Sequence, residues 1–90
     1  MIGNLGDIAP DRPYPGIERR RIDADGATLV WYAFEPGAAF PVHRHRQEQV
    51  TVVEAGTVIL RSGRDDVREL GPGGYSILTG GVEHGITAGP

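Results

Sequence analysis

Three histidines stand at spacings that suit metal binding. His43 and His45 are two residues apart, and His84 lies close to the C-terminal end of the sequence. Residues i and i+2 of a β-strand project from the same face, with their Cα atoms about 7 Å apart, so the two early imidazoles can reach one ion. His84 follows the Gly80-Gly81 pair and can converge on them from another strand. Since imidazole nitrogens are common ligands of divalent first-row metals, this pattern predicts a metal site.

Gln49 is the expected fourth ligand. It follows His45 by four residues and begins the next apolar run. Glu48 is the rival, but strand alternation places its side chain on the opposite face if Gln49 faces the histidines, so we favour Gln49. Three imidazoles and one amide oxygen leave coordination positions open for water or substrate. A neutral amide also leaves the ion its full double charge, which favours polarisation of a substrate oxygen and weakens metal binding.

The segments that position these residues are predicted to be short antiparallel strands. From residue 17 onward, short apolar runs alternate with turn-forming clusters about every 8 to 12 residues, which is typical of a β-sandwich or barrel. Gly supplies 14 and Pro 7 of the 90 residues, and no run has a helical period long enough for a helix. The predicted strands cover residues 17–22, 27–34, 40–45, 49–54, 57–61, 67–70, 75–78 and 83–87.

The 90 residues leave room for one small domain, which we place over residues 17–90. Residues 1–16 carry three prolines and little apolar periodicity, so we expect an N-terminal arm that lies over the surface. Such an arm would be ordered only where it docks against another segment.

The composition excludes several functions. The sequence has no Cys and its nine basic residues are all Arg, which rules out disulfides, thiolate metal sites and Schiff-base lysines. The formal net charge is −3, with acids scattered among the arginines, so we expect no nucleic-acid partner. No apolar run has the length of a signal peptide or membrane span. We therefore expect a soluble, cytoplasmic protein that does not bind membranes.

The histidine pair belongs to a longer pattern that resembles the cupin superfamily. The first cupin motif is Gly, five residues, His, one residue, His, three or four residues, Glu, six residues, Gly. Here Gly37, His43, His45, Gln49 and Gly56 satisfy every spacing, with Gln49 in the place of the usual Glu.

The second cupin motif is Gly, five residues, Pro, one residue, Gly, two residues, His, three residues, Asn. Gly73, Gly81 and His84 match it, whereas Thr79 stands in place of the Pro and Ala88 in place of the Asn. The resemblance covers roughly residues 29–86, which is most of the chain.

The resemblance implies an all-β fold, a small antiparallel double-stranded β-helix of the jelly-roll or cupin type. It implies one divalent transition metal (Fe, Mn, Ni, Zn or Cu) in the barrel mouth, held by His43, His45, Gln49 and His84. The expected function is that of a small metal-dependent enzyme, of the isomerase, lyase or dioxygenase type, acting on a small oxygenated or carbonyl metabolite. The alternative is a non-catalytic module that binds a sugar-like or effector molecule.

Only six residues follow His84, whereas small cupins usually continue through one or two further strands. An unpaired sheet edge favours association with another chain. We therefore expect either a homodimer that covers the open edge or a chain that is part of a longer protein.

Overall fold

The chain forms nine β-strands, in which successive side chains point to opposite faces and which are separated by turns that contain glycine. A computed structural model describes all of residues 1–90, and none of its helical segments is long and apolar enough to cross a membrane. The elements in chain order are η1 (Leu5–Asp7), β1 (Asp11–Tyr14), β2 (Ile17–Asp23), β3 (Thr28–Phe34), β4 (Ala39–His43), β5 (Gln49–Val52), β6 (Val58–Ser62), β7 (Asp66–Leu70), β8 (Tyr75–Leu78) and β9 (His84–Ala88).

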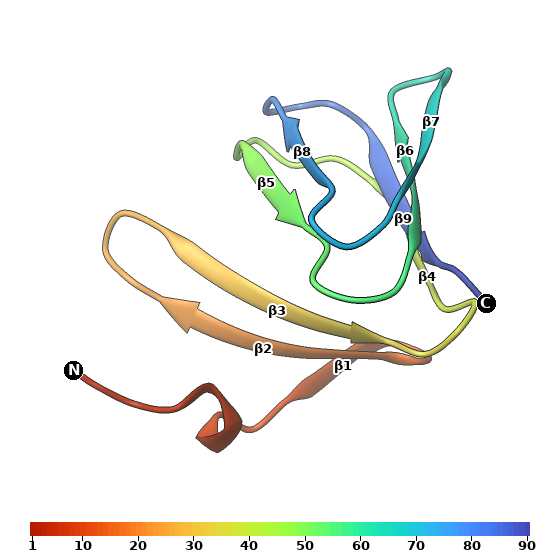
Figure 1. The fold of residues 1–90 in the computed structure, drawn as a ribbon. Coiled ribbons are helices and arrows are strands. Elements are labelled where there is room, and N and C mark those ends of the chain that lie inside the picture. Colours follow the sequence, from red (N-terminus) through yellow and green to blue (C-terminus); the bar gives the residue numbers. More distant parts are fainter.

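The strands form three antiparallel sheets. Their orders are β1-β2-β3, β4-β9-β6-β7 and β5-β8. Figure 1 shows the β5-β8 pair opposite the four-stranded sheet, with the long β2-β3 hairpin extending along one side. Trp31 of β3 donates a hydrogen bond to Glu54, just after β5, at 3.3 Å. The predicted all-β, antiparallel jelly-roll class is confirmed.

The predicted strands are all present, but their ends differ in one place that concerns the site. β4 was expected to reach His45, and it ends at His43. Its partner β9 begins at His84, which is paired with His43, so residues after His43 have no strand to pair with. His45 therefore lies in the connection between β4 and β5, and not on the same strand as His43.

The sequence analysis did not predict β1, which lies within the expected arm. Asp11 of β1 is paired with Arg19 of β2, and the two side chains form an ion pair at 2.5 Å. Arg20 donates to the carbonyl oxygen of Ile8 at 3.0 Å. The segment is thus docked on β2 of the same chain, while the division into arm and barrel stays a prediction.

The apolar interior is small. Only seven of the 90 residues are buried, and Ile17 is the one large side chain with no exposed surface. Leu60 of β6 points toward the two-stranded sheet, and Leu78 of β8 points toward the four-stranded sheet. They are 7% and 6% exposed. The interior is therefore built from few apolar side chains, and His84 is its one buried polar residue.

Candidate metal centre

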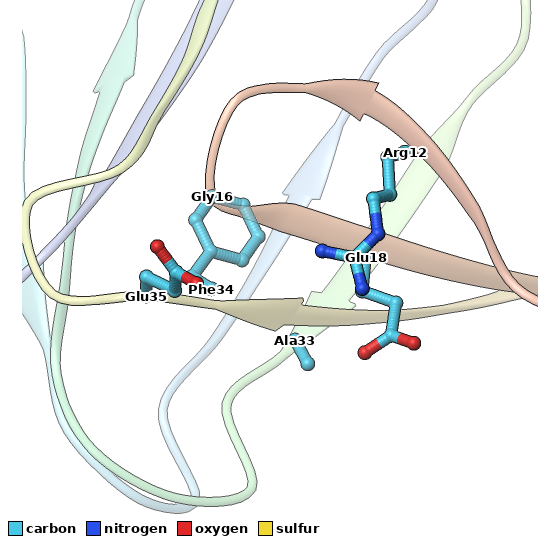
Figure 2. A pocket seen from close by; sticks show the side chains of 6 residues that line it. All are labelled: Arg12, Gly16, Glu18, Ala33, Phe34 and Glu35. Carbon is cyan, nitrogen blue, oxygen red and sulfur yellow. The ribbon is translucent and has the colours of Figure 1, made fainter.

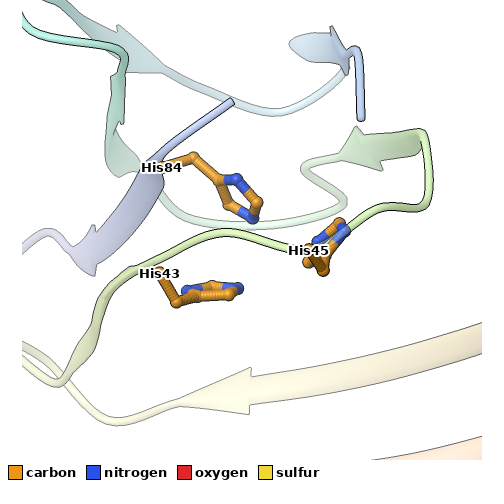
Figure 3. Close-up of side chains that lie close together, drawn as sticks. All are labelled: His43, His45 and His84. Carbon is orange, nitrogen blue, oxygen red and sulfur yellow. The ribbon is translucent and has the colours of Figure 1, made fainter. Parts of the chain in front are cut away.

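The fold brings the three histidines together. His43 ends β4 and His84 begins β9, and the two are direct cross-strand partners. The ring centroid of His84 lies 4.3 Å from that of His43 and 4.9 Å from that of His45. The nitrogens that could bind a metal all lie within 4.8 Å of one another, and Figure 3 shows the three rings turned toward a common space. Small side-chain rotations would bring all three within bonding distance of one ion.

The Gly80-Gly81 turn positions His45 beside His84. The Gly81 N–H donates to the carbonyl oxygen of His45 at 2.7 Å. A Cβ atom at Gly80 would lie 2.0 Å from the carbonyl oxygen of Arg46, which no side chain could tolerate. Gly81 has a φ of +86°, a left-handed conformation that favours glycine. Two glycines therefore allow the connection carrying His45 to approach the segment that leads into β9.

Each imidazole is oriented by a backbone carbonyl. The Nδ1 atoms of His43, His45 and His84 lie 2.8, 2.9 and 3.0 Å from carbonyl oxygens two residues away in the chain. Those oxygens belong to Pro41, Gln47 and Val82. Because a carbonyl can only accept, Nδ1 carries the proton and each neutral ring keeps its lone pair on Nε2. This is a usual arrangement of metal-binding histidines, in which the ring nitrogen that does not bind the metal donates to a carbonyl.

Gln49 points into the histidine cluster, as the sequence indicates. Its Oε1 atom lies 3.0 Å from Nε2 of His45, and its Nε2 atom donates to Thr51 Oγ1 at 2.9 Å. With Nδ1 of His45 protonated, Nε2 of His45 and Oε1 of Gln49 are both hydrogen-bond acceptors, and they face each other. A cation between or beside them would relieve this arrangement. The rival Glu48 is exposed to solvent.

His84 is the most deeply buried of the three rings. The residue is 4% exposed, and its Nε2 atom is buried without a hydrogen-bond partner. Burial lowers the pKa of His84 below its usual value; the hydrogen bond to Val82 opposes this change, and the neighbouring His43 and His45 add to it. A buried, neutral imidazole with an unpartnered nitrogen fits a metal ligand, so the donor set suits a divalent ion.

Aromatic side chains and an ion pair lie near the histidine cluster. Phe40 packs against His43 with ring centroids 4.9 Å apart, and Tyr32 packs against Phe40 at 5.6 Å. Arg44 lies between His43 and His45 in sequence, Glu83 precedes His84, and the two form an ion pair with each other. The sequence analysis missed Thr51, although its position two residues after Gln49, on the same strand face, is a signal that could have found it.

A separate shallow pocket of about 140 Å³ lies on the β1-β2-β3 sheet (Figure 2). Arg12, Glu18 and Glu35 are its charged residues, and none of the three histidines lines it. This pocket is therefore separate from the candidate metal centre.

Known proteins resemble this chain in sequence pattern and in fold. A family model described as "Cupin domain" matches residues 30–89. The RmlC-like cupin from Shewanella frigidimarina is 21% identical, with a TM-score of 0.82 over 96% of this chain and 78% of its own. KdgF from a Halomonas species is 22% identical, with a TM-score of 0.84 over 98% of this chain and 84% of its own.

A further similar structure is oxalate decarboxylase from Lactobacillus farciminis, solved as a formate complex. It is 17% identical, with a TM-score of 0.83 over 99% of this chain but only 30% of its own. At these identities the structures share the fold alone, and no curated protein matches the sequence. Because the family model spans most of the residues, including all three histidines, the chain belongs to the cupin family.

Proposed function

We propose that the protein binds one divalent transition metal through His43, His45, His84 and Gln49 and acts as a small metal-dependent enzyme. The observation that carries the proposal is the shared orientation of the three rings. Each Nδ1 atom is held by a backbone carbonyl, and the buried Nε2 atom of His84 has no partner in the protein. Such unpaired acceptors are costly to bury unless a cation binds them.

A bound ion would supply Lewis-acid polarisation of a substrate oxygen or, for a redox metal, activation of dioxygen. The chain's own residues would orient the ligands and shield the site. Thr51 holds the Gln49 amide with its oxygen toward the histidines, and Phe40 covers one side of His43. We infer a small oxygenated or carbonyl metabolite as substrate, with isomerase, lyase or dioxygenase chemistry. The fold itself does not choose among these reactions.

A non-catalytic binding module is the second candidate, and one contact favours it. Glu83 is the acidic residue next to His84 and would be the nearest choice for a general acid or base. It is already paired with Arg44. With its nearest acidic side chain already paired, the site suits binding of a sugar-like or effector molecule.

The metal proposal predicts the stoichiometry of binding. Protein stripped with a chelator and reloaded with Zn²⁺ or Mn²⁺ should hold about one ion per chain, and His43→Ala or His84→Ala should reduce this to less than about a tenth, by elemental analysis. Thr51→Val should weaken binding by about tenfold, since it releases the amide of Gln49.

Glu48→Gln is the matched control, because Glu48 adjoins Gln49 and is exposed. Its metal content should equal that of the unchanged protein. An unchanged protein with less than about a tenth of an equivalent would contradict the metal site, as would full occupancy in the His84→Ala variant.

The enzyme proposal predicts substrate turnover that depends on the metal and on the residues that bind it. Metal-loaded protein should convert at least one compound in a panel of small diketones, uronates and phenolic diols, followed by mass spectrometry. The activity should disappear in His84→Ala and after chelation, because both remove the ion that polarises the substrate. A metal-loaded protein that binds such compounds but converts none would favour the binding module.

The burial of His84 predicts how the stability of the metal-free protein depends on pH. The folded-state pKa of His84 lies below the unfolded value of about 6.5, so below that pH the unfolded chain takes up the proton more readily. The free energy of unfolding should therefore fall as the pH drops from 7.5 to 5.5, in urea denaturation. His84→Gln should show a smaller decrease, and an equal or larger one would contradict this assignment.

We also propose that two copies of the chain associate. β5 and β8 carry four outward apolar side chains, Val50, Val52, Tyr75 and Ile77, which are 60–67% exposed and form cross-strand pairs. β3 and β5 are each at the edge of a sheet, and neither edge is paired. A chain with seven buried residues has little interior of its own, and association is a usual way to stabilise so small a domain.

The homodimer proposal predicts a mass of twice 9.6 kDa in sedimentation equilibrium. Val50→Lys should convert the dimer to monomer, because it places a charge at the centre of the apolar surface, opposite Ile77. Ile59→Lys on the outer face of β6 is the control and should leave the dimer intact. A monomeric unchanged protein, or a dimer that survives Val50→Lys, would rule out this interface.

A further inference from the structure

A cleft of mixed apolar and polar lining lies between the two facing sheets, on the far side of His84 from His43. Its volume is about 260 Å³, and it is an open cleft bordered by β6 and β7 on one side and β8 on the other. Five of its nine lining residues are apolar, of which Leu60 and Leu78 are buried while Tyr75 and Ile77 are exposed. The residues used below are Leu60, Ser62, Asp66, Arg68, Ser76 and Leu78. None of them is part of the proposed ligand set.

Strand pairing places this cleft directly beside the histidine cluster on the four-stranded sheet. His84 is the cross-strand partner of Ser62, and Ser62 is the partner of Asp66. Directly opposite residues share a face of the sheet, with Cβ atoms about 5 Å apart. The row from His84 through Ser62 to Asp66 therefore leads from the metal-binding side into the cleft, over roughly 10 Å for two strand spacings.

The two-stranded sheet repeats this relation on the opposite wall. Gln49 is the partner of Leu78, and Thr51 is the partner of Ser76. Gln49 and Thr51 are already joined by a hydrogen bond. On both sheets, residues that line the cleft are therefore direct cross-strand partners of His84, Gln49 and Thr51.

Ser76 supplies an unused hydrogen-bonding group inside the cleft. Its Oγ atom is buried and has no hydrogen-bond partner in the protein. Buried hydroxyls are normally paired, and Ser76 lines the cleft, so rotation about its Cα–Cβ bond would let this unpaired hydroxyl meet a bound molecule. A hydroxyl group on a ligand is the simplest match, since it can both donate and accept.

Arg68 supplies a positive charge at the mouth of the cleft. Its Nε atom donates to Asp66 Oδ1 at 2.9 Å, which fixes the plane of the guanidinium group. Its two terminal nitrogens make no hydrogen bond in the protein and lie on a side chain that is 74% exposed. Paired terminal N–H groups match the two oxygens of a carboxylate, which is the geometry that Arg recognises best.

We propose that the cleft binds a small hydroxycarboxylic acid, with the carboxylate on Arg68 and a hydroxyl group on Ser76. The ligand's remaining oxygen atoms would face His84 and Gln49. The proposal rests on the proposed function where it makes this ligand the substrate. Binding in the cleft itself requires only Arg68, Ser76 and the space between the sheets.

The experiment is a titration of the metal-free, ¹⁵N-labelled protein with L-malate, followed by amide chemical shifts. Saturable shifts are expected around Ser62, Arg68 and Ser76. Arg68→Gln and Ser76→Ala should each weaken malate binding by about tenfold, since each removes a hydrogen bond to the ligand. Arg61→Gln is the matched control: Arg61 is exposed, one residue from Ser62 and on the other face of β6, and its loss should not alter the affinity.

Two further measurements and one substitute variant distinguish loss of ligand binding from loss of folding. Butane-1,2,4-triol has the carbon chain of malate without its carboxylates and should bind at least about tenfold more weakly. Ser76→Ala removes a buried hydroxyl without a partner, so its urea midpoint should equal or exceed that of the unchanged protein. If Arg68→Gln does not fold, Arg68→Lys replaces it, with weaker malate binding expected because Lys lacks the paired geometry.

Equal affinity for malate and the triol, unchanged affinity in the Arg68 and Ser76 variants, or no saturable shifts would overturn the cleft proposal. The result is separable from the metal site. Malate binding by an unchanged protein that takes up no metal would contradict the proposed function alone. Full metal occupancy without malate binding would contradict the cleft alone.

Discussion

The hydrogen bond between each histidine Nδ1 atom and a backbone carbonyl is the constraint on which the site depends. It fixes the tautomer and the plane of the ring together, so that all three lone pairs face the same space. The carbonyls belong to residues two positions away in the chain, which makes the orientation a local property of each segment. The fold then brings together three segments whose histidine rings are already oriented. The His43–His84 pairing and the Gly81–His45 hydrogen bond do so.

Much of this arrangement could be predicted from the sequence, because spacing and strand alternation carry it. The residues that converge are those the cupin pattern indicates, and the inward position of Gln49 against the exposed Glu48 follows from a two-residue period. Thr51 obeys the same period and was missed only because its hydroxyl is not itself a metal ligand. Whether these residues hold an ion stays a prediction.

Other parts could not be predicted, for identifiable physical reasons. β1 contains Pro13 and only four residues, so it shows no apolar alternation, and its place depends on pairing with β2 and on the contact of Tyr14 with Phe40. The early end of β4 depends on where its partner β9 begins, which is a tertiary property. The carbonyls that orient the rings are backbone atoms and have no residue type to reveal them. The cleft at Ser76 depends on space left unfilled, which composition does not record.

The thin interior gives the proposed ion a second role. A ligand that binds only the folded chain adds to its stability by an amount that grows with the logarithm of free ligand concentration. In a domain with seven buried residues, that increment would be a large share of the total. The abundance of the protein in a cell would then follow the supply of its metal, since chains made during scarcity would unfold more often and be degraded first.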